Sequence, residues 1–587
     1  MNDSTRRPNL ETILFVLAVF LAFALRLFHL GDLPLSDDEA RWAMQAFDFA
    51  KGLHPVIGPQ PAYVLLTALL FYAFQASNFM ARFLPALVGA SLVFAPLLFR
   101  DRLGNKVALV LSFVLAIEPG LLALSRQAGS PIIAFATVIF ACGFWRIGNV
   151  RLAGIMAGLA LLAGPLLWPG VIGIALAYFL SNAFLRSSDQ ESTDVEKQPL
   201  FDRKQLMTAG FYALGTYLAV GSLFLLATPG GLSAGLAALP AYLAGWVPAA
   251  GAVVSWSYLI LALVVYEFFA VVLAAITLVR GIMQKDRQVM ILGIWLAMAL
   301  LVAILYPSRQ VADLVWVLIP LWLLAALEFS RYLVPAKDEV WTTLAMTGGT
   351  IAILIFALFN FLTIAISPLD MSATARTFGT LTLTNGEVYG SVVVGALLLL
   401  VASVALVGYG WSRDVAFQGA TWGLLIAFVF YTFSATIAAG GLRTRLSQEL
   451  WSSGPQTLQA ETLTKQMGDL SRWDVGVDKG LDVFVSGVDS PALHWALRDW
   501  NATYSTAPTL TGTPAFVIAS NQLSAPELAS GYRGQEFTLR GYPGWDSSTP
   551  ADWLRWAMSH NVPNGEEKIV LWTRTDIFID ARSSQQP

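Results

Sequence analysis

Apolar stretches of about twenty residues recur from near the N-terminus to about residue 440, separated by short polar or basic segments. Each stretch is long enough to cross a bilayer as one α-helix. The chain is 56% hydrophobic and 13% charged, whereas soluble domains carry about 25% charged residues. We therefore predict a polytopic α-helical membrane protein. About thirteen spans are expected, near residues 11–30, 82–99, 107–124, 131–146, 152–168, 169–186, 206–226, 253–280, 288–306, 311–330, 341–366, 389–411 and 416–440.

The distribution of lysine and arginine predicts the orientation of these spans in the membrane, because cytoplasmic loops carry an excess of both residues. With a cytoplasmic N-terminus, every basic loop falls on the cytoplasmic side. The short apolar segment 62–75 would reverse the later loops if it crossed, so we expect it to lie in the interface. The chain is thus predicted to be a multi-pass cell-membrane protein with an extracytoplasmic C-terminal part. The basic loop residues are Arg6, Arg7, Arg100, Arg102, Lys106, Arg146, Arg151, Arg186, Lys197, Arg203, Lys204, Arg280, Lys285, Arg287, Arg331 and Lys337.

Composition changes near residue 442. Residues 1–441 form the expected transmembrane domain, which includes an outer loop over 31–81 and a polar cytoplasmic loop over 187–204. Residues 442–587 have a globular composition and are expected to fold as a soluble extracytoplasmic α/β domain. Strand-like runs in it cover 481–486, 515–519 and 569–572, and a helical pattern covers 551–560.

Some function classes are excluded by residue counts. Net charge is −3 and is spread along the chain, so no nucleic-acid partner is expected. The single cysteine, Cys142, allows neither an internal disulfide nor a cysteine metal site. The four histidines are scattered, and none is paired at the spacing of metal ligands.

Three consecutive carboxylates, Asp37, Asp38 and Glu39, follow the first span directly. Ionisable groups near a bilayer are costly and therefore indicate a functional site. A structural interpretation also applies, because Ser36 can cap a helix whose first turn favours acidic residues. The two interpretations are compatible.

Three motifs carry a resemblance to a known family. Arg26 ends the first span and precedes the Asp-Glu pair; Gly58–Tyr63 and Ala81–Gly89 follow. In this order they resemble the GT-C superfamily of membrane glycosyltransferases, in particular family 39, which includes protein O-mannosyltransferases and the lipid-A aminoarabinose transferase. Segments of the C-terminal part resemble most the prokaryotic flippase-activity-associated branch of that family. These segments are 490–500, 532–540 and 552–556, together with Tyr266-Glu267 in a span.

The resemblance implies a GT-C-like fold and an inverting transfer of sugar from a polyprenyl-phosphate carrier to a lipid, glycan or protein acceptor outside the cell. Asp38 matches the family's catalytic base. Glu39 would orient Asp38 or an arginine, and Asp37 replaces Asp38 if the match is shifted by one residue. Two departures favour an alternative, a non-catalytic protein that binds polyprenyl-linked glycans or assists their flipping. The lysine of the family's element is missing near Gln60, and Ser130 stands where the family has a second acid.

The departing phosphate calls for arginine. Arg82 and Arg126 match arginines of the family, and Arg309 and Arg41 are further candidates. Each of them has an alternative role, in which its head reaches lipid headgroups. No cofactor is predicted. Adjacent carboxylates can hold a divalent metal, but Ser130 speaks against a metal site shared by two loops.

Other residues have two interpretations each. Glu267, inside a span, is expected to be functional or paired. The Gly/Ala/Pro-rich segment 229–251 is a flexible connector or a broken helix, and we favour the connector. Aromatic residues of the C-terminal part form a core or stack on sugars, and we favour the core. They are Trp495, Trp500, Trp553 and Trp556.

Overall fold

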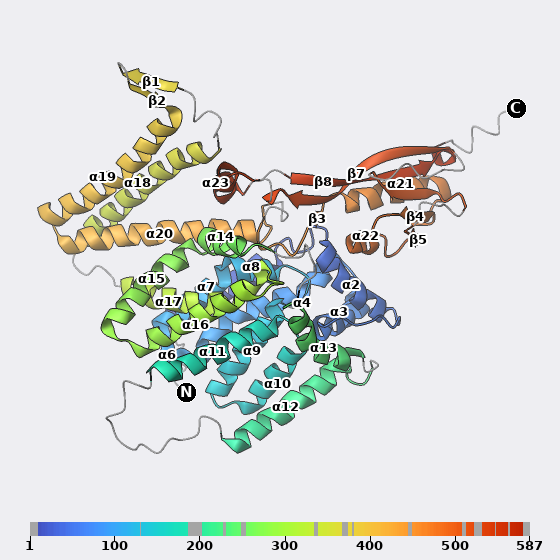
Figure 1. The fold of residues 1–587 in the computed structure, drawn as a ribbon, viewed down its shortest axis with the longest axis horizontal. Coiled ribbons are helices and arrows are strands. Elements are labelled where there is room, and N and C mark those ends of the chain that lie inside the picture. The colour runs from blue at the N-terminus through green and yellow to red at the C-terminus, as the bar shows by residue number, and fades with distance from the viewer. Residues whose placement is uncertain are drawn as a thin grey trace, which may run out of the picture.

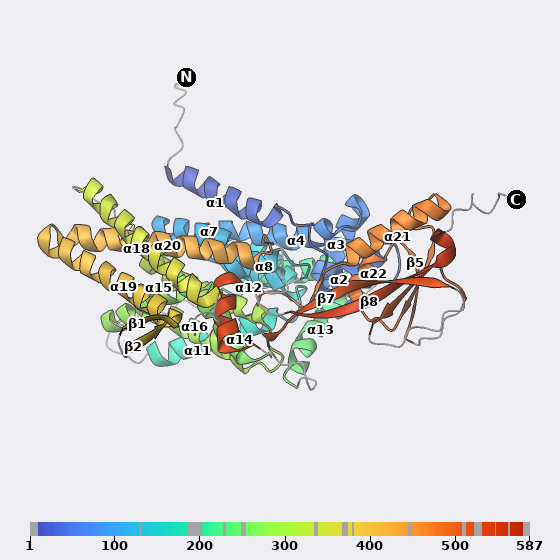
Figure 2. The same cartoon turned by 90° about the horizontal axis from the view of Figure 1, so that it is seen from above.

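The computed structural model describes residues 10–129, 131–185, 202–226, 230–247, 254–333, 339–366, 374–378, 381–443, 449–506, 512–521, 531–545, 548–560 and 564–578. A helical membrane domain carries a sheet domain at one end, beside α2 (Asp37–Ala50) and α3 (Pro61–Phe74) (Figures 1 and 2). Some residues named above lie outside the described ranges: Arg6, Arg7, Ser130, Arg186, Lys197 and Lys337.

Each predicted span coincides with a helix or a helix pair. By length and composition, eight helices among the described residues can cross a membrane, or up to ten if each bent pair is one span. The three other predicted spans, α9, α10 and α12, are shorter or less apolar. The helices are α1 (Leu10–Leu27), α4 (Asn78–Ser91) continued by η1 (Leu92–Phe94) and α5 (Ala95–Leu98), α7 (Asn105–Ile117) with α8 (Pro119–Ser125), α9 (Pro131–Arg146), α10 (Val150–Leu161), α11 (Leu167–Leu185), α12 (Arg203–Gly221), α14 (Trp256–Tyr266) with α15 (Phe268–Gln284), α16 (Arg287–Leu305), η2 (Val311–Leu314) with α17 (Val315–Tyr332), α18 (Val340–Ile366), α19 (Asn385–Gly410) and α20 (Arg413–Ala439).

Small residues bring α10 and α12 into close contact. A Cβ atom at Gly154 or Gly158 would overlap a backbone carbonyl oxygen of α12, that of Ala209 or Ala213. Helices in a membrane associate through such close packing, because lipid provides no hydrophobic drive between them. The two glycines therefore hold α12 against the bundle.

We expect Gly158→Ala to destabilise the protein by about 1–3 kcal/mol through overpacking, although alanine is the better helix former. Gly215→Ala is the matched control, since a Cβ at Gly215 on α12 meets nothing within 4 Å. Thermal unfolding in detergent should show a lower Tm for the first variant and an unchanged or higher Tm for the second. Equal Tm values would contradict this packing.

The segment after α12 is not the flexible connector favoured from sequence. Residues Gly230–Ala244 form α13, and the ring of Tyr242 stacks on Tyr306 with a centroid distance of 4.8 Å. A two-stranded antiparallel hairpin between α18 and α19 was also not predicted. It comprises β1 (Thr374–Phe378) and β2 (Leu381–Thr384).

The C-terminal domain contains a six-stranded mixed sheet in the order β3-β7-β8-β6-β4-β5. Strand β4 is parallel to both of its neighbours, and the other pairs are antiparallel. The predicted strand runs and the C-terminal helix are confirmed. The elements are β3 (Gln456–Thr457), α21 (Ala460–Val475), β4 (Asp482–Ser486), α22 (Pro491–Ala496), β5 (Asn501–Ser505), β6 (Phe516–Ser520), β7 (Tyr532–Pro543), α23 (Pro550–Ser559), β8 (Asn564–Arg574) and η6 (Thr575–Phe578).

Candidate functional site

The carboxylate cluster forms the first turn of α2, and Ser36 is its N-cap. The Ser36 hydroxyl accepts from the backbone N–H of Glu39 at 3.3 Å, and the Glu39 carboxylate accepts from the Ser36 N–H at 3.0 Å. This reciprocal capping box satisfies two N–H groups that a helix start leaves unpaired. The capping role expected for the cluster is thus confirmed, and it rests on Glu39.

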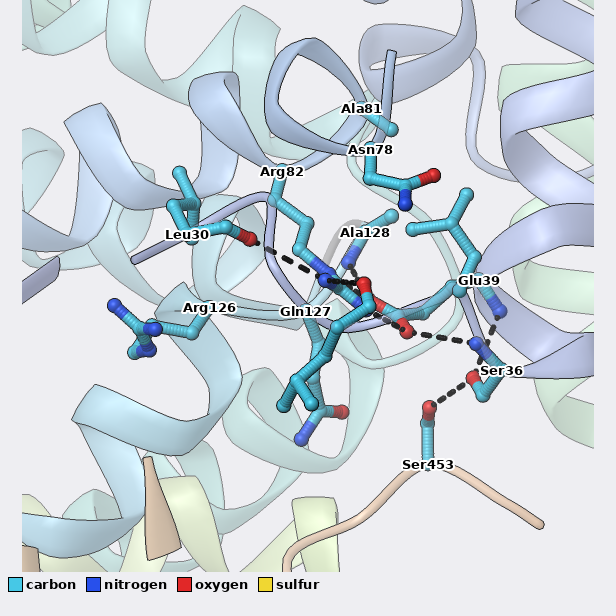
Figure 3. A network of polar contacts seen from close by, with 12 residues as sticks. Leu30, Ser36, Glu39, Asn78, Ala81, Arg82, Arg126, Gln127, Ala128 and Ser453 are labelled. Atoms are coloured by element: carbon cyan, nitrogen blue, oxygen red, sulfur yellow. Dashed lines mark hydrogen bonds and ion pairs between the residues drawn. The ribbon is translucent and has the colours of Figure 1, made fainter. Parts of the chain in front are cut away.

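Glu39 is buried against Arg82 of α4 (Figure 3). Its two carboxylate oxygens accept from Nε and Nη2 of Arg82, both at 2.7 Å, and one of them also accepts from the Ala128 N–H at 2.8 Å. Burial alone would raise the pKa of Glu39, but the Arg82 charge and these hydrogen bonds outweigh it, so its pKa is lowered. Glu39 is therefore an ionised structural group.

Arg82 has no donor nitrogen left for a ligand. Besides the ion pair, it donates to the backbone carbonyls of Leu30, Leu33 and Pro34 at 3.3, 2.7 and 3.0 Å. These three residues belong to the turn that leads from α1 to the carboxylates. Arg82 and Glu39 together fix the position of α2.

Asp37 joins α2 to the C-terminal domain. It accepts from the Ser490 hydroxyl at 2.6 Å and the Ala492 N–H at 3.0 Å, both at the start of α22. Its other oxygen lies 2.5 Å from Nε of Arg540, which also pairs with Glu567 at 3.0 Å. These contacts occupy both oxygens of Asp37.

Asp38 differs from its two neighbours. It is half-buried, and within the described ranges it makes no hydrogen bond and no ion pair. Burial raises the pKa of Asp38, and the charges of Asp37 and Glu39 add to this shift, while Arg41 opposes it. An unbonded carboxylate with a raised pKa has the properties of a general base.

A segment that follows α20, residues 449–457, crosses over the start of α2, and we call it the strap. Ser453 and Ser36 are hydrogen-bonded at 3.1 Å, and the Thr457 hydroxyl donates to the Leu35 carbonyl at 3.0 Å. Gly454 lies beside Asp38, where an added Cβ would sit 2.9 Å from Oδ2. The absence of a side chain at Gly454 leaves space next to this carboxylate.

The predicted phosphate-binding arginines differ in availability. Arg126 donates to five backbone carbonyls, those of Leu25, Arg26, Phe28, His29 and Gly440, at 2.7–3.2 Å. Arg309 donates through Nε to the carbonyl of Val254, just before α14, and through Nη1 to those of Ile304 and Tyr306 at the end of α16. Arg41 is exposed and forms no hydrogen bond or ion pair with any described residue. It lies one turn along α2 from Asp38.

Glu267 is paired, and sequence reasoning missed its partner. Glu118 lies at the 52° bend between α7 and α8, and Glu267 at the 89° bend between α14 and α15. The two carboxyl groups are buried close to each other, and Trp322 Nε1 donates to Glu267 at 2.9 Å. The signal for Glu118 was an acid before a proline inside an apolar run.

A second buried network links the membrane domain to the strap. The Tyr266 hydroxyl donates to Glu449 at 2.5 Å, and Nδ1 of His560 lies 3.1 Å from the same carboxylate. Sequence reasoning did not single out Glu449 or link it to His560, because the three residues come from distant segments. Together they tie α14, the strap and α23.

Trp500 is buried in the core of the C-terminal domain, as expected. Trp495 and Trp556 are buried instead against the membrane domain, where their rings contact Phe71 and Tyr266. Trp553 stacks on Trp545 with a centroid distance of 4.7 Å. In the part of the chain that the structure describes, no group of three or more His, Cys, Asp or Glu residues is placed to hold a metal ion.

No protein-family model and no curated protein matches the chain by sequence. Among solved structures, ArnT from Cupriavidus metallidurans bound to undecaprenyl phosphate has a TM-score of 0.56 and 14% identity, and the alignment covers 96% of this chain and 98% of ArnT. Apo ArnT from the same organism has a TM-score of 0.54, 15% identity and the same coverage. An oligosaccharyltransferase from Archaeoglobus fulgidus, tethered to an acceptor peptide, has a TM-score of only 0.43 at 13% identity, covering 84% of this chain and 63% of that one. The chain therefore shares the fold of ArnT, and the expected GT-C-like fold is confirmed.

Proposed function

We propose that the protein is a membrane glycosyltransferase that moves a sugar from a polyprenyl-phosphate carrier to an extracytoplasmic acceptor, with Asp38 as the general base. The main support for this proposal is that the three carboxylates of the cluster differ in their bonding. Glu39 fixes the helix start, Asp37 binds the C-terminal domain, and Asp38 has no bonding partner among the residues that the structure describes. The shared fold with ArnT, which has been crystallised with undecaprenyl phosphate, supports a carrier of this kind.

The proposed step is a displacement at the anomeric carbon. The acceptor hydroxyl gives its proton to the Asp38 carboxylate while its oxygen forms a bond to that carbon. The bond between the anomeric carbon and the phosphate oxygen breaks, and the electron pair leaves with polyprenyl phosphate. The space beside Gly454 is where the acceptor hydroxyl would approach Asp38.

The leaving phosphate needs a cation, and we assign this role first to Arg41, because its guanidinium is exposed and has no bonding partner among the described residues. Arg309 is a second candidate through its Nη2 group, which donates to none of the described residues. Arg82 and Arg126 would act indirectly, since their donors hold the carbonyls around the carboxylate turn.

The direct test uses purified protein in detergent with polyprenyl-phosphate sugars and a broad set of acceptors. Formation of free polyprenyl phosphate that depends on acceptor supports the transferase. Binding of the carrier without any release of sugar would overturn it in favour of the non-catalytic alternative, a protein that binds polyprenyl-linked glycans.

The pH dependence follows from the raised pKa of Asp38. A base works only when ionised, so turnover should fall as the pH drops through that pKa, which lies above the ordinary value of 3.8. Arg41→Gln removes the one charge that favours ionisation and should move this acid limb to higher pH. Initial rates over a pH series check the result, and an acid limb that moves to lower pH would contradict it.

A further inference from the structure

A cavity of about 530 Å³ lies between the C-terminal domain and the membrane domain, next to the start of α2. The turn after α1 and the start of α4 form one wall, and α21 and α22 form the other. Neither Asp38 nor Arg41 lines it. Its volume falls in the range of about 300–1,000 Å³ that is usual for small-molecule sites.

Two buried donors in the lining have no hydrogen-bond partner in the described part of the chain. One is Nε1 of Trp500, a residue with only 7% of its surface exposed. The other is Nε of Arg498, which lies 3.9 Å from the Asp499 carboxylate, too far for a hydrogen bond. Buried donors are almost always paired, so two unsatisfied donors in residues of one cavity wall favour a ligand that supplies acceptor oxygens.

Positively charged side chains in the lining also favour a ligand that carries acceptor oxygens. Lys465 of α21 lines the cavity and pairs with no described residue. Arg472, about two helical turns further along α21, also lines it. Arg472 is already neutralised by Asp469 and Asp478, each at 2.7 Å. Lys465 is therefore the charge that is available to an anionic group.

Acceptors line the same space, and they limit what the ligand can be. Glu461 accepts from the Asn78 amide at 2.7 Å, and the Asn78 oxygen accepts from Trp495 Nε1 at 2.8 Å. The second oxygen of Glu461 would repel a bare phosphate, but it suits a hydroxyl donor. Donors, acceptors and aromatic rings in one cavity fit a molecule that carries both hydroxyl groups and an anionic group.

We propose that this cavity binds a phosphorylated saccharide, with the anionic group near Lys465 and Trp500 and the sugar hydroxyls toward Glu461. The source is either a soluble sugar phosphate or the headgroup of a glycolipid, since the start of α4 borders the cavity where a membrane helix begins. The proposal concerns binding only and stands independently of transfer at Asp38.

The test measures binding to the full-length protein in detergent, with a sugar 1-phosphate, the uncharged sugar, inorganic phosphate and an anionic glycolipid as separate probes. Lys465→Glu should weaken binding of the sugar phosphate about tenfold, the value of one charge-assisted hydrogen bond. Ala496→Phe, which places a ring into the cavity from α22, should abolish it. Lys568→Glu is the matched control, because it makes the same charge change outside the cavity.

Different outcomes separate the possibilities. Tighter binding of the glycolipid than of the sugar phosphate, with both weakened by Lys465→Glu, supports a headgroup as the source, and the reverse order supports a soluble ligand. The proposal is overturned if neither binds, if inorganic phosphate binds as tightly as the sugar phosphate, or if Lys568→Glu weakens binding as much as Lys465→Glu. Asp38→Asn should leave binding at this cavity unchanged, so a failure here is distinguishable from a failure of the proposed transfer.

Discussion

Asp38→Asn should reduce the rate of sugar transfer by about 10²–10⁴-fold, the usual contribution of a general base. Asparagine keeps the size and polarity of the side chain but accepts no proton. Because Asp38 bonds to none of the described residues, the Tm should change by no more than about 1–2 °C. Rates of polyprenyl phosphate release and thermal unfolding of the same preparations check both halves of the prediction.

Asp37→Asn is the matched control, one residue away with the same chemical change. It weakens the contact with Arg540 and the start of α22, so we expect a lower Tm and a smaller loss of rate. The reverse pattern, in which Asp37→Asn abolishes transfer and Asp38→Asn does not, would move the base to Asp37.

The second large effect is expected on stability. Glu39→Ala leaves the Arg82 guanidinium buried without its counter-ion, which costs about 3–5 kcal/mol. Glu11→Ala is the control, because Glu11 pairs with Arg100 at a similar distance of 2.6 Å but on the surface, where the loss is about 0–1 kcal/mol. Detergent-induced unfolding measures both values.

A double variant makes this prediction sharper. Glu39→Met combined with Arg82→Met replaces both charges by apolar side chains and should be more stable than Glu39→Ala alone. If the single variant is no less stable than the surface control, the Glu39–Arg82 pair does not hold the start of α2.

Much of the fold could be predicted because its causes are local. Apolar length sets the spans, and Ser36 followed three residues later by Glu39 is a complete capping signal. The continuous apolar run over residues 515–519 was enough for a strand. By contrast, the wrong alternative was favoured for α13, because its Gly/Ala/Pro composition suits a loop, whereas packing of Tyr242 on Tyr306 stabilises a helix.

The residues alone predicted where the candidate site lies, whereas the separate roles of Asp38 and Glu39 came only from the family resemblance; the pairing of Glu39 with an arginine is confirmed. Three adjacent carboxylates are alike in sequence, and only their distant partners distinguish them: Arg82 for Glu39 and Ser490 with Arg540 for Asp37. Likewise, nothing near Arg126 in the sequence indicates that its guanidinium donates hydrogen bonds to backbone carbonyls at the end of α1. Glu118 and Glu267 come close together only because two helix pairs bend at these residues.

The contact between Asp37 and Ser490 spans 453 positions of the chain, and that between Ser36 and Ser453 spans 417. At a synthesis rate of about 5–20 residues per second, the first turn of α2 waits roughly 20–90 s before these partners leave the ribosome. During that interval the carboxylate turn lacks its strap and the bond that anchors Asp37. A nascent or truncated chain thus inserts its first helices with an unfinished site, and completion of the C-terminal domain is the event that assembles it.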